Sequence, residues 1–575
     1  MGYLSKYWGR YWRLFITAVS FLMMEAMCDL LQPTIMSKIV DVGVAGKDLH
    51  YVLTRGALML GVTAFGAVSA ITRNIVSSNV SQRFGRDLRS DLYRKIQFFS
   101  FENVDKFEAA SLVTRLTNDI TQVQNFVNGL MRIFVKAPLL CIGGLVMAFL
   151  LNPKMALVLL AVVPIVGTII FISMKTGYPF FIKVQQSLDK VNGVMREYLT
   201  GVRVVKAFNR FAYEEKRFAA VNQELADNSI TAMRIMAVFS PFINLTVNIS
   251  IIAVLWFGGF RVNNGAMQVG QIIAFINYMT QILFSLMMLS FIFTNFVRAK
   301  ASSERIGKVL AEENTLKNPE AAVSLEKVKG RVDFENVSFR YANASGEPVL
   351  KNLSFSCLPG ETLGIIGSTG SGKSTLVNLI PRFYDVVSGR VKVNGVDVRY
   401  ADTKELREKI AVVPQKTVLF TGSILENLRW GKETAALEEI KEAAAAAQAH
   451  SFIEALPEGY DTHLGRGGVN LSGGQKQRVS IARALVRKPE ILILDDCTSA
   501  VDVTTELKIK EALRSYTERL TCIIIAQRIT SVMDADKILV LDNGEIAGMG
   551  THEELMKTCE VYSDIFHSQI GREGI

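Results

Sequence analysis

The chain has 575 residues and a formal net charge of +10, with 49% hydrophobic and 21% charged residues. This length exceeds what one hydrophobic core supports, and the composition fits neither a soluble enzyme nor a bare membrane bundle, so we expect a membrane domain joined to a soluble one. No basic run with interleaved aromatic residues occurs, so the positive charge favours anionic lipid over nucleic acid as the partner.

Six apolar stretches are long enough to cross a bilayer, for which a helix needs about 20 residues. They are residues 14–36, 52–71, 133–151, 155–174, 235–260 and 269–296. Lys and Arg are few in the three short connections and many in the two long ones, 72–132 and 175–234. Because cytoplasmic connections carry the excess of cations, we expect a multi-pass protein of the cell (inner) membrane with both termini in the cytoplasm.

The two long connections keep helical periodicity and contain a single proline, Pro179. We therefore expect the membrane helices to continue into the cytoplasm as long extensions. Each pair must reverse at its far end, and the likeliest turn residues place the reversals near 101–109 and 209–215. These tips could press on a cytoplasmic domain.

Two carboxylates lie inside the first predicted span. Glu25 and Asp29 are four residues apart and therefore share one helix face. Because carboxylates facing lipid are costly, they should face the bundle or a watery cavity. They could form a site for cationic cargo or a gate, and a structural pair bonded to neighbouring helices is an equal alternative.

Beyond the sixth span the pattern changes to short strand-like runs separated by helical stretches, which favours an α/β domain. The strand-like runs are 332–339, 362–366, 491–494 and 521–525. A short polar segment precedes them and is typical of a linker. We predict a transmembrane domain at 1–310, a linker at 311–328 and a nucleotide-binding domain at 329–575.

A glycine-rich loop follows the second strand-like run and precedes a helical stretch, which is the context of a phosphate-binding loop. The loop consists of Gly367, Ser368, Thr369, Gly370, Ser371, Gly372, Lys373, Ser374 and Thr375. Its glycines let backbone N–H groups converge on phosphate oxygens, Lys373 reaches the outer phosphates, and the Ser374 hydroxyl ligates magnesium. We expect ATP and Mg2+ as cofactors.

The apolar run 491–494 ends in two carboxylates, Asp495 and Asp496. Asp495 would hold the magnesium ion through water, and Asp496 stands where a general base would face the attacking water. By itself such a run is also common as the end of a structural strand.

The segment 471–478, Leu-Ser-Gly-Gly-Gln-Lys-Gln-Arg, resembles the signature sequence of ABC ATPases. With six spans placed before it, the whole chain resembles an ABC exporter half-transporter. Structurally, Ser472 is a reasonable helix N-cap with Gly473 and Gly474 as a turn. The resemblance implies that Ser472 to Gln475 close over the phosphate loop of a second subunit in a dimer.

The same resemblance assigns three further positions. Tyr341 matches the aromatic residue that stacks on adenine, and Gln415 matches the glutamine that contacts magnesium or water and couples to the membrane domain. Asp502 ends a segment that resembles the loop crossing the dimer interface. An ordinary strand tyrosine, a loop glutamine and an N-capping aspartate are the structural alternatives.

Three positions depart from the pattern of an active ABC site, and one of them is Arg466, which stands where an acidic residue is typical. Asp496 replaces the usual glutamate and is one methylene shorter, and Gln527 replaces the usual histidine, so it cannot carry a proton or a positive charge. Together they predict a site that retains ATP and seldom hydrolyses it, whereas the signature is intact. The chain resembles the degenerate-site subunit of heterodimeric bacterial multidrug exporters, which implies a second half-transporter as partner.

The predicted function is therefore ATP-driven export of hydrophobic or amphipathic small molecules, with most hydrolysis at the site completed by the partner. A lipid flippase or a peptide exporter is an alternative within exporters. An ATP-gated channel or sensor is an alternative of another class, made plausible by Asp496 and Gln527. A soluble ATP-driven machine on DNA or ribosomes conflicts with the six spans.

Overall fold

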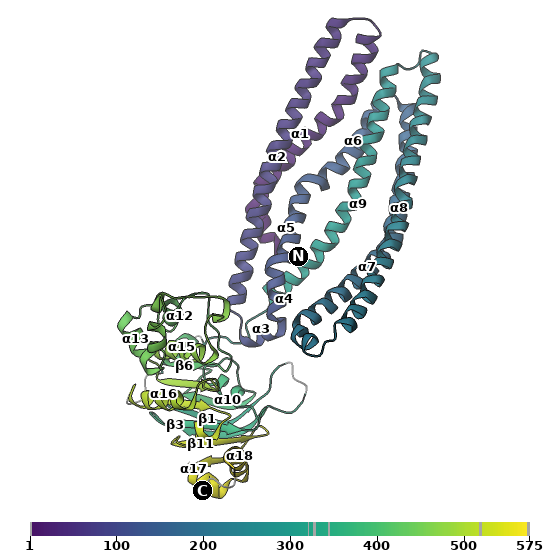
Figure 1. The fold of residues 1–575 in the computed structure, drawn as a ribbon. Helices are drawn as coiled ribbons and strands as arrows, with labels where there is room; N and C mark the ends of the chain where they lie inside the picture. Colours follow the sequence, from purple (N-terminus) through teal and green to yellow (C-terminus); the bar gives the residue numbers. More distant parts are fainter. Residues whose placement is uncertain (1–2, 320, 326–328, 343–345, 517–519, 572–575) are drawn as a thin grey trace. The chain divides into compact units, whose positions relative to one another are not determined.

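The computed structural model describes residues 3–319, 321–325, 329–342, 346–516 and 520–571 (Figure 1). The chain forms two compact units, the first made of Met1–Gln97 and Ala110–Glu312 and the second of Phe98–Ala109 and Glu313–Ile575. Of the predicted linker 311–328, residues 320 and 326–328 lie outside the described residues.

The first unit is helical, and six of its helical segments are long and apolar enough to cross a membrane. The α-helices are α1 (Leu4–Lys38), α2 (Leu49–Gln97), α4 (Ala109–Thr114), α5 (Ile120–Gly129), α6 (Val135–Leu151), α7 (Pro153–Ala207), α8 (Phe211–Asn263) and α9 (Val269–Ala311). Three π-helical turns join or extend them, namely η1 (Ile39–Val44), η2 (Arg115–Asp119) and η3 (Leu130–Phe134). The predicted six-span fold class is confirmed.

The three longest of the described helices are much longer than a bilayer requires. Helices α2, α7 and α8 have 49, 55 and 53 residues. At 1.5 Å per residue they exceed twice the roughly 30 Å of the hydrocarbon core. In Figure 1, α1 lies beside α2, and α7 beside α8, over most of their length. The helices therefore continue beyond the apolar spans, as their periodicity predicted.

The core of the first unit lies where α9 meets α7. Phe275 and Tyr278 of α9 are fully buried in one cluster with Leu159 and Val166 of α7. The Tyr278 hydroxyl donates to the backbone carbonyl of Leu30 at 2.6 Å, so its polar end is satisfied inside the apolar bundle.

The chain reverses direction near both predicted places. Helix α7 ends at Ala207, Asn209 has a positive φ of 50°, and α8 begins at Phe211. Between α2 and α4, the short helix α3 (Phe101–Phe107) belongs to the second unit. A capping box at Ser100 and Asn103 starts this helix.

Helix α3 is held in the second unit by polar and aromatic contacts. The buried Asn103 side chain donates to the Glu313 carbonyl at 3.1 Å, and the Ser100 and Thr315 hydroxyls lie 2.7 Å apart. The Phe101 ring lies 4.7 Å from the Phe383 ring. The tip of the α2–α4 hairpin is therefore an integral part of this unit.

The described part of the second unit contains three sheets. The largest has the order β12-β11-β3-β10-β9-β6, and all neighbours are parallel except β12 at the edge. Its strands are β3 (Thr362–Gly367), β6 (Ile410–Val413), β9 (Ile491–Asp495), β10 (Thr521–Ile525), β11 (Lys537–Asp542) and β12 (Glu545–Gly550). All five residues of β9 are buried, as expected for a strand covered on both faces.

An antiparallel sheet of order β2-β1-β4-β5 and a small β7-β8 pair complete the strands. These are β1 (Val332–Phe339), β2 (Leu350–Cys357), β4 (Ser388–Val393), β5 (Val396–Asp397), β7 (Gly422–Ser423) and β8 (His463–Leu464). The helices are α10 (Lys373–Leu379), α11 (Thr403–Lys409), α12 (Ile424–Arg429), α13 (Leu437–Ala446), α14 (His450–Glu454), α15 (Gly473–Val486), α16 (Val503–Tyr516), α17 (His552–Thr558) and α18 (Glu560–Ile570). The predicted α/β domain is confirmed.

Candidate functional site

Four neighbouring parallel strands end at one edge of the large sheet, and each carries predicted site residues. The glycine-rich loop follows β3, Gln527 follows β10, Asp495 ends β9, and Gln415 follows β6. Because the carboxyl ends of parallel strands meet at the same edge, residues far apart in sequence come together there. This edge is where ligands bind in open α/β sheets.

The loop after β3 has a conformation that its glycines permit. Gly372 precedes α10 with a φ of 98°, and a Cβ at this position would lie 2.7 Å from a methyl carbon of Leu350. The Lys373 ammonium donates to the carbonyls of Gly367 at 2.8 Å and Ser368 at 2.7 Å, so the lysine bridges its own loop. Burial lowers the pKa of Lys373.

Ser374 and Asp495 form the pair expected to hold a cation. The Ser374 hydroxyl donates to Oδ1 of Asp495 at 3.0 Å. Burial raises the pKa of the Asp495 carboxyl, and a divalent cation at this place would oppose that effect. A hydroxyl and a carboxylate beside a phosphate-binding loop are oxygen ligands that suit Mg2+.

The predicted catalytic residues form one hydrogen-bonded group. Oδ2 of Asp496 accepts from the amide of Gln527 at 2.8 Å and from the amide of Gln415 at 3.2 Å. The backbone N–H of Asp496 donates to the Ile525 carbonyl at 2.9 Å, and the Asp496 side chain is mostly buried. The carboxylate at the expected general-base position is thus tied to two neutral amides.

Tyr341 lies beside the end of the glycine-rich loop. Its hydroxyl is 3.1 Å from the Thr375 hydroxyl, and its ring packs edge-on against Phe339 and Tyr384. The tyrosine is therefore next to the loop, with one ring edge held by other aromatic residues.

The signature segment starts α15 through a capping box. The Ser472 hydroxyl accepts from the Gln475 N–H at 3.3 Å, and the Gln475 side chain accepts from the Ser472 N–H at 2.9 Å. Ser472 and Gly473 are exposed, and a Cβ on Gly474 would lie 2.8 Å from the Ala500 carbonyl. The N-cap interpretation of Ser472 describes this geometry, and it leaves the helix N-terminus open to a ligand.

Asp502 caps α16. Its carboxylate accepts from the Thr505 N–H at 2.9 Å and from the Thr504 hydroxyl at 3.0 Å. The Thr505 N–H is the largest cause that lowers the pKa of Asp502 to about 2. Within this chain, Asp502 has the geometry of the N-capping alternative.

The two carboxylates of the first span have cationic partners within the helical unit. Glu25 is buried, and its oxygens lie 3.1 Å from Nε of Arg73 on α2 and 2.5 Å from Nζ of Lys136 on α6. Lys136 also lies 3.0 Å from Asp29. Neither cation was predicted from the sequence. Lys136 lies inside a predicted span, where burying its positive charge in the membrane is as costly as burying the negative charge of Glu25.

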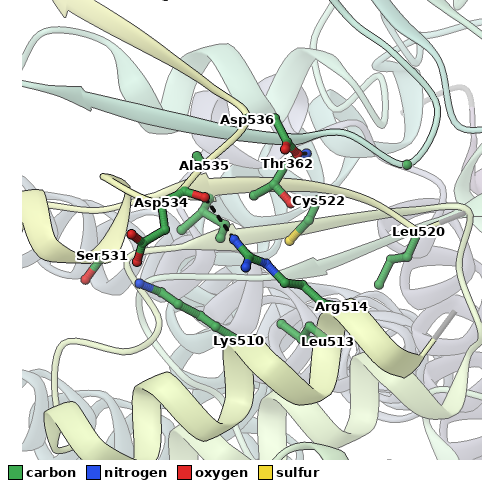
Figure 2. Close-up of a pocket in the computed structure, with 12 residues that line it drawn as sticks. Thr362, Lys510, Leu513, Arg514, Leu520, Cys522, Ser531, Asp534, Ala535 and Asp536 are labelled. Carbon is green, nitrogen blue, oxygen red and sulfur yellow. Dashed lines mark hydrogen bonds between the residues drawn. The ribbon is translucent and has the colours of Figure 1, made fainter. Parts of the chain in front are cut away.

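A cavity of about 250 Å3 in the second unit lies away from this site (Figure 2). Its lining includes Gly360 just before β3, Thr362 at the start of β3 and Cys522 near the start of β10. Arg514 extends from α16 across it and donates to the Asp534 carbonyl at 2.9 Å. The cavity is therefore at the amino ends of the strands, opposite the phosphate-binding edge.

Comparison with known protein families matches both parts of the chain. Residues 15–287 match the ABC transporter transmembrane region, and residues 350–499 match the family described as ABC transporter.

Several curated proteins are similar over most of their length. An uncharacterized ABC transporter ATP-binding protein of Bacillus subtilis (strain 168), YfiB, is 43% identical over 97% of this chain and 96% of that protein. An ATP-dependent lipid A-core flippase of Syntrophus aciditrophicus (strain SB) is 34% identical over 84% of this chain and 80% of that protein.

A solved structure of a bacterial Atm1-family ABC exporter with ATP bound has a TM-score of 0.79 and 27% identity, covering 98% of this chain and 99% of that one. The fold described above thus agrees with these matches. The chain belongs to the ABC transporter family, with a membrane region and an ATP-binding ATPase domain in one polypeptide of exporter fold.

Proposed function

We propose that this chain is one subunit of an ATP-driven exporter that moves hydrophobic or amphipathic compounds out of the cytoplasm or the inner leaflet. The family supports ATP hydrolysis coupled to transport, and the six apolar helices support a multi-pass membrane protein. The proposed location is the cell (inner) membrane, with the ATPase domain and both termini cytoplasmic. The proposed domain limits are 1–310, 311–328 and 329–575.

The proposed nucleotide site uses the residues gathered at the carboxyl edge of the sheet. Lys373 and the backbone of its loop bind the phosphates, Ser374, Gln415 and Asp495 hold Mg2+, and Tyr341 stacks on adenine. Gly473, Gly474 and their neighbours Ser472 and Gln475 serve the nucleotide of the other subunit, with Asp502 at the interface.

The partner is a second, different half-transporter. The observation that carries this proposal is that the Asp496 carboxylate accepts hydrogen bonds from the side-chain amides of Gln527 and Gln415. The Asp496 carboxylate is one methylene shorter than that of glutamate, and the amides that hold it cannot accept a proton, so it is poorly placed to activate water. A displacement of a catalytic group by about 1 Å lowers the rate by about a hundredfold. A homodimer would contain two such sites, whereas a partner with glutamate and histidine would complete an active site with this chain's signature.

Glu25 and Asp29 belong to a structural ion cluster in this proposal. Arg73 and Lys136 already neutralise them, which supports the structural alternative over a site for cationic cargo. A flippase is the second candidate for the function, and the 34% identity to a lipid A-core flippase supports it.

The decisive experiment measures ATP hydrolysis and ATP binding by this chain alone, purified into lipid nanodiscs. We expect ATP binding with hydrolysis close to background. A Lys373→Ala variant, which removes the phosphate-binding ammonium, should lose ATP binding and serves as the control. Robust turnover by the single chain, abolished in that variant, would contradict the heterodimer.

A further inference from the structure

The backbone of the segment that contains Gln527 is hydrogen-bonded to a side chain of α18, the last described helix. The Gln569 amide of α18 donates to the Gln527 carbonyl at 2.7 Å, and its oxygen accepts from the Ile529 N–H at 2.8 Å. These two bonds flank Arg528, whose backbone is extended at φ −90° and ψ 130°. A single side-chain amide thus satisfies two backbone groups of an extended segment, as a neighbouring strand would.

Apolar contacts fix α18 in the place from which Gln569 reaches this segment. Tyr562 is fully buried and Phe566 is 9% exposed, in one cluster with Ala526, Ile529 and Ile366. Ala526 and Ile529 flank Gln527 and Arg528, and Ile366 directly precedes the phosphate-binding loop. The helix cannot shift without disturbing the core beneath both loops.

The backbone of Gln527 is fixed by Gln569, and its side chain bonds Asp496 at 2.8 Å. A chain of contacts therefore runs from α18 through the backbone of Gln527 to the carboxylate beside the proposed terminal phosphate. We propose that Gln569 is a positioning residue that holds Gln527 where it contacts the terminal phosphate of ATP. This inference rests on the proposed nucleotide site.

The amide chemistry of Gln569 makes the proposal specific. Glutamate would keep the acceptor for the Ile529 N–H but lose the donor to the Gln527 carbonyl, and leucine would lose both. Because the terminal phosphate is the one group of the nucleotide that Gln527 is proposed to contact, loss of its position should weaken the binding of a triphosphate and spare ADP.

The experiment uses the full chain in lipid nanodiscs and follows release of N-methylanthraniloyl-labelled AMP-PNP and of ADP with the same label. We expect Gln569→Leu to speed AMP-PNP release about five- to tenfold, since two hydrogen bonds are lost, and to leave ADP release within about twofold. Gln569→Glu should act in the same direction. Ser568→Ala, which removes only a bond to the Ile565 carbonyl, should match the parent chain.

A double-mutant cycle separates positioning from a general structural role. In a Gln527→Ala background, Gln569→Leu should change AMP-PNP release by less than about twofold, because the group through which it acts is gone. Equal acceleration of AMP-PNP and ADP release, no change from the parent chain, or an undiminished effect in that background would each overturn the inference. Failure of the parent chain to bind AMP-PNP would overturn the proposed nucleotide site as well.

Discussion

At the scale of single residues, Asp496 connects the ends of three strands. Its carboxylate accepts from Gln415 after β6 and from Gln527 after β10, while Asp496 itself follows β9. A histidine at 527 could bond the terminal phosphate and carry positive charge, whereas glutamine remains neutral. We therefore expect the residue at 527 to affect both the carboxylate and the nucleotide.

We predict that Asp496→Glu combined with Gln527→His raises hydrolysis at this site by about tenfold or more, because the longer carboxylate reaches the attacking water. Phosphate release from the complex with its partner, measured after the partner's own site has been inactivated, checks this. Asp461→Glu, an exposed carboxylate lengthened away from the site, is the control. No gain in the double variant would mean that the partner's signature limits the rate.

The residues of the phosphate-binding loop could be assigned from sequence, because their spacing is local. The partners of Glu25 could not, since Lys136 and Arg73 lie 111 and 48 positions away and only the helix packing brings them together. Gln569 was also missed, because a single glutamine outside any motif carries no pattern that predicts its contacts.

At the scale of elements, apolar periodicity predicted the six membrane helices and four of the strands. The run 332–339 matches β1, and 521–525 matches β10. The π-helical turn η3 was not predicted, because one extra residue in a turn barely disturbs an apolar stretch. The antiparallel strand β4 was also missed, since exposed and charged positions interrupt its pattern, and β5 was missed because it has only two residues.

Three helices of the membrane region meet at the Glu25 cluster, which links α1 to α2 and α6. We predict that Glu25→Gln destabilises the protein by about 3 kcal/mol or more, because Arg73 and Lys136 then lose a buried counter-charge. A fall in the thermal unfolding midpoint in nanodiscs measures this.

The pairing itself is tested with a second substitution. Glu25→Gln with Arg73→Gln should cost less than the sum of the two single changes, since neither charge is then left without its partner. Lys6→Gln, which removes an exposed cation paired with Asp91, is the control and should change the midpoint little. Strict additivity would show that the two charges do not stabilise each other.

At the scale of the whole molecule, the proposal of two unequal ATP sites predicts asymmetric effects. Ser472→Ala removes the cap that opens α15 toward the partner's nucleotide, whereas Lys373→Ala disables this chain's own loop.

In the complex with its partner, we expect Ser472→Ala to lower ATP hydrolysis several-fold more than Lys373→Ala does, because the proposal assigns the main hydrolysis to the site that Ser472 completes. Ser568→Ala should leave the rate unchanged. Equal losses from both variants would indicate two equivalent sites and contradict the asymmetry.

The placement of α3 in the second unit also affects the order in which the parts of the molecule can fold during synthesis. The chain passes between units after Gln97, after Ala109 and after Glu312. Synthesis from the N-terminus delivers Phe101 and Asn103 more than 200 residues before Phe383 and Glu313, which they contact. A fragment that begins after α9 would lack these contacts, so the second unit reaches its final form only in a chain that includes α3.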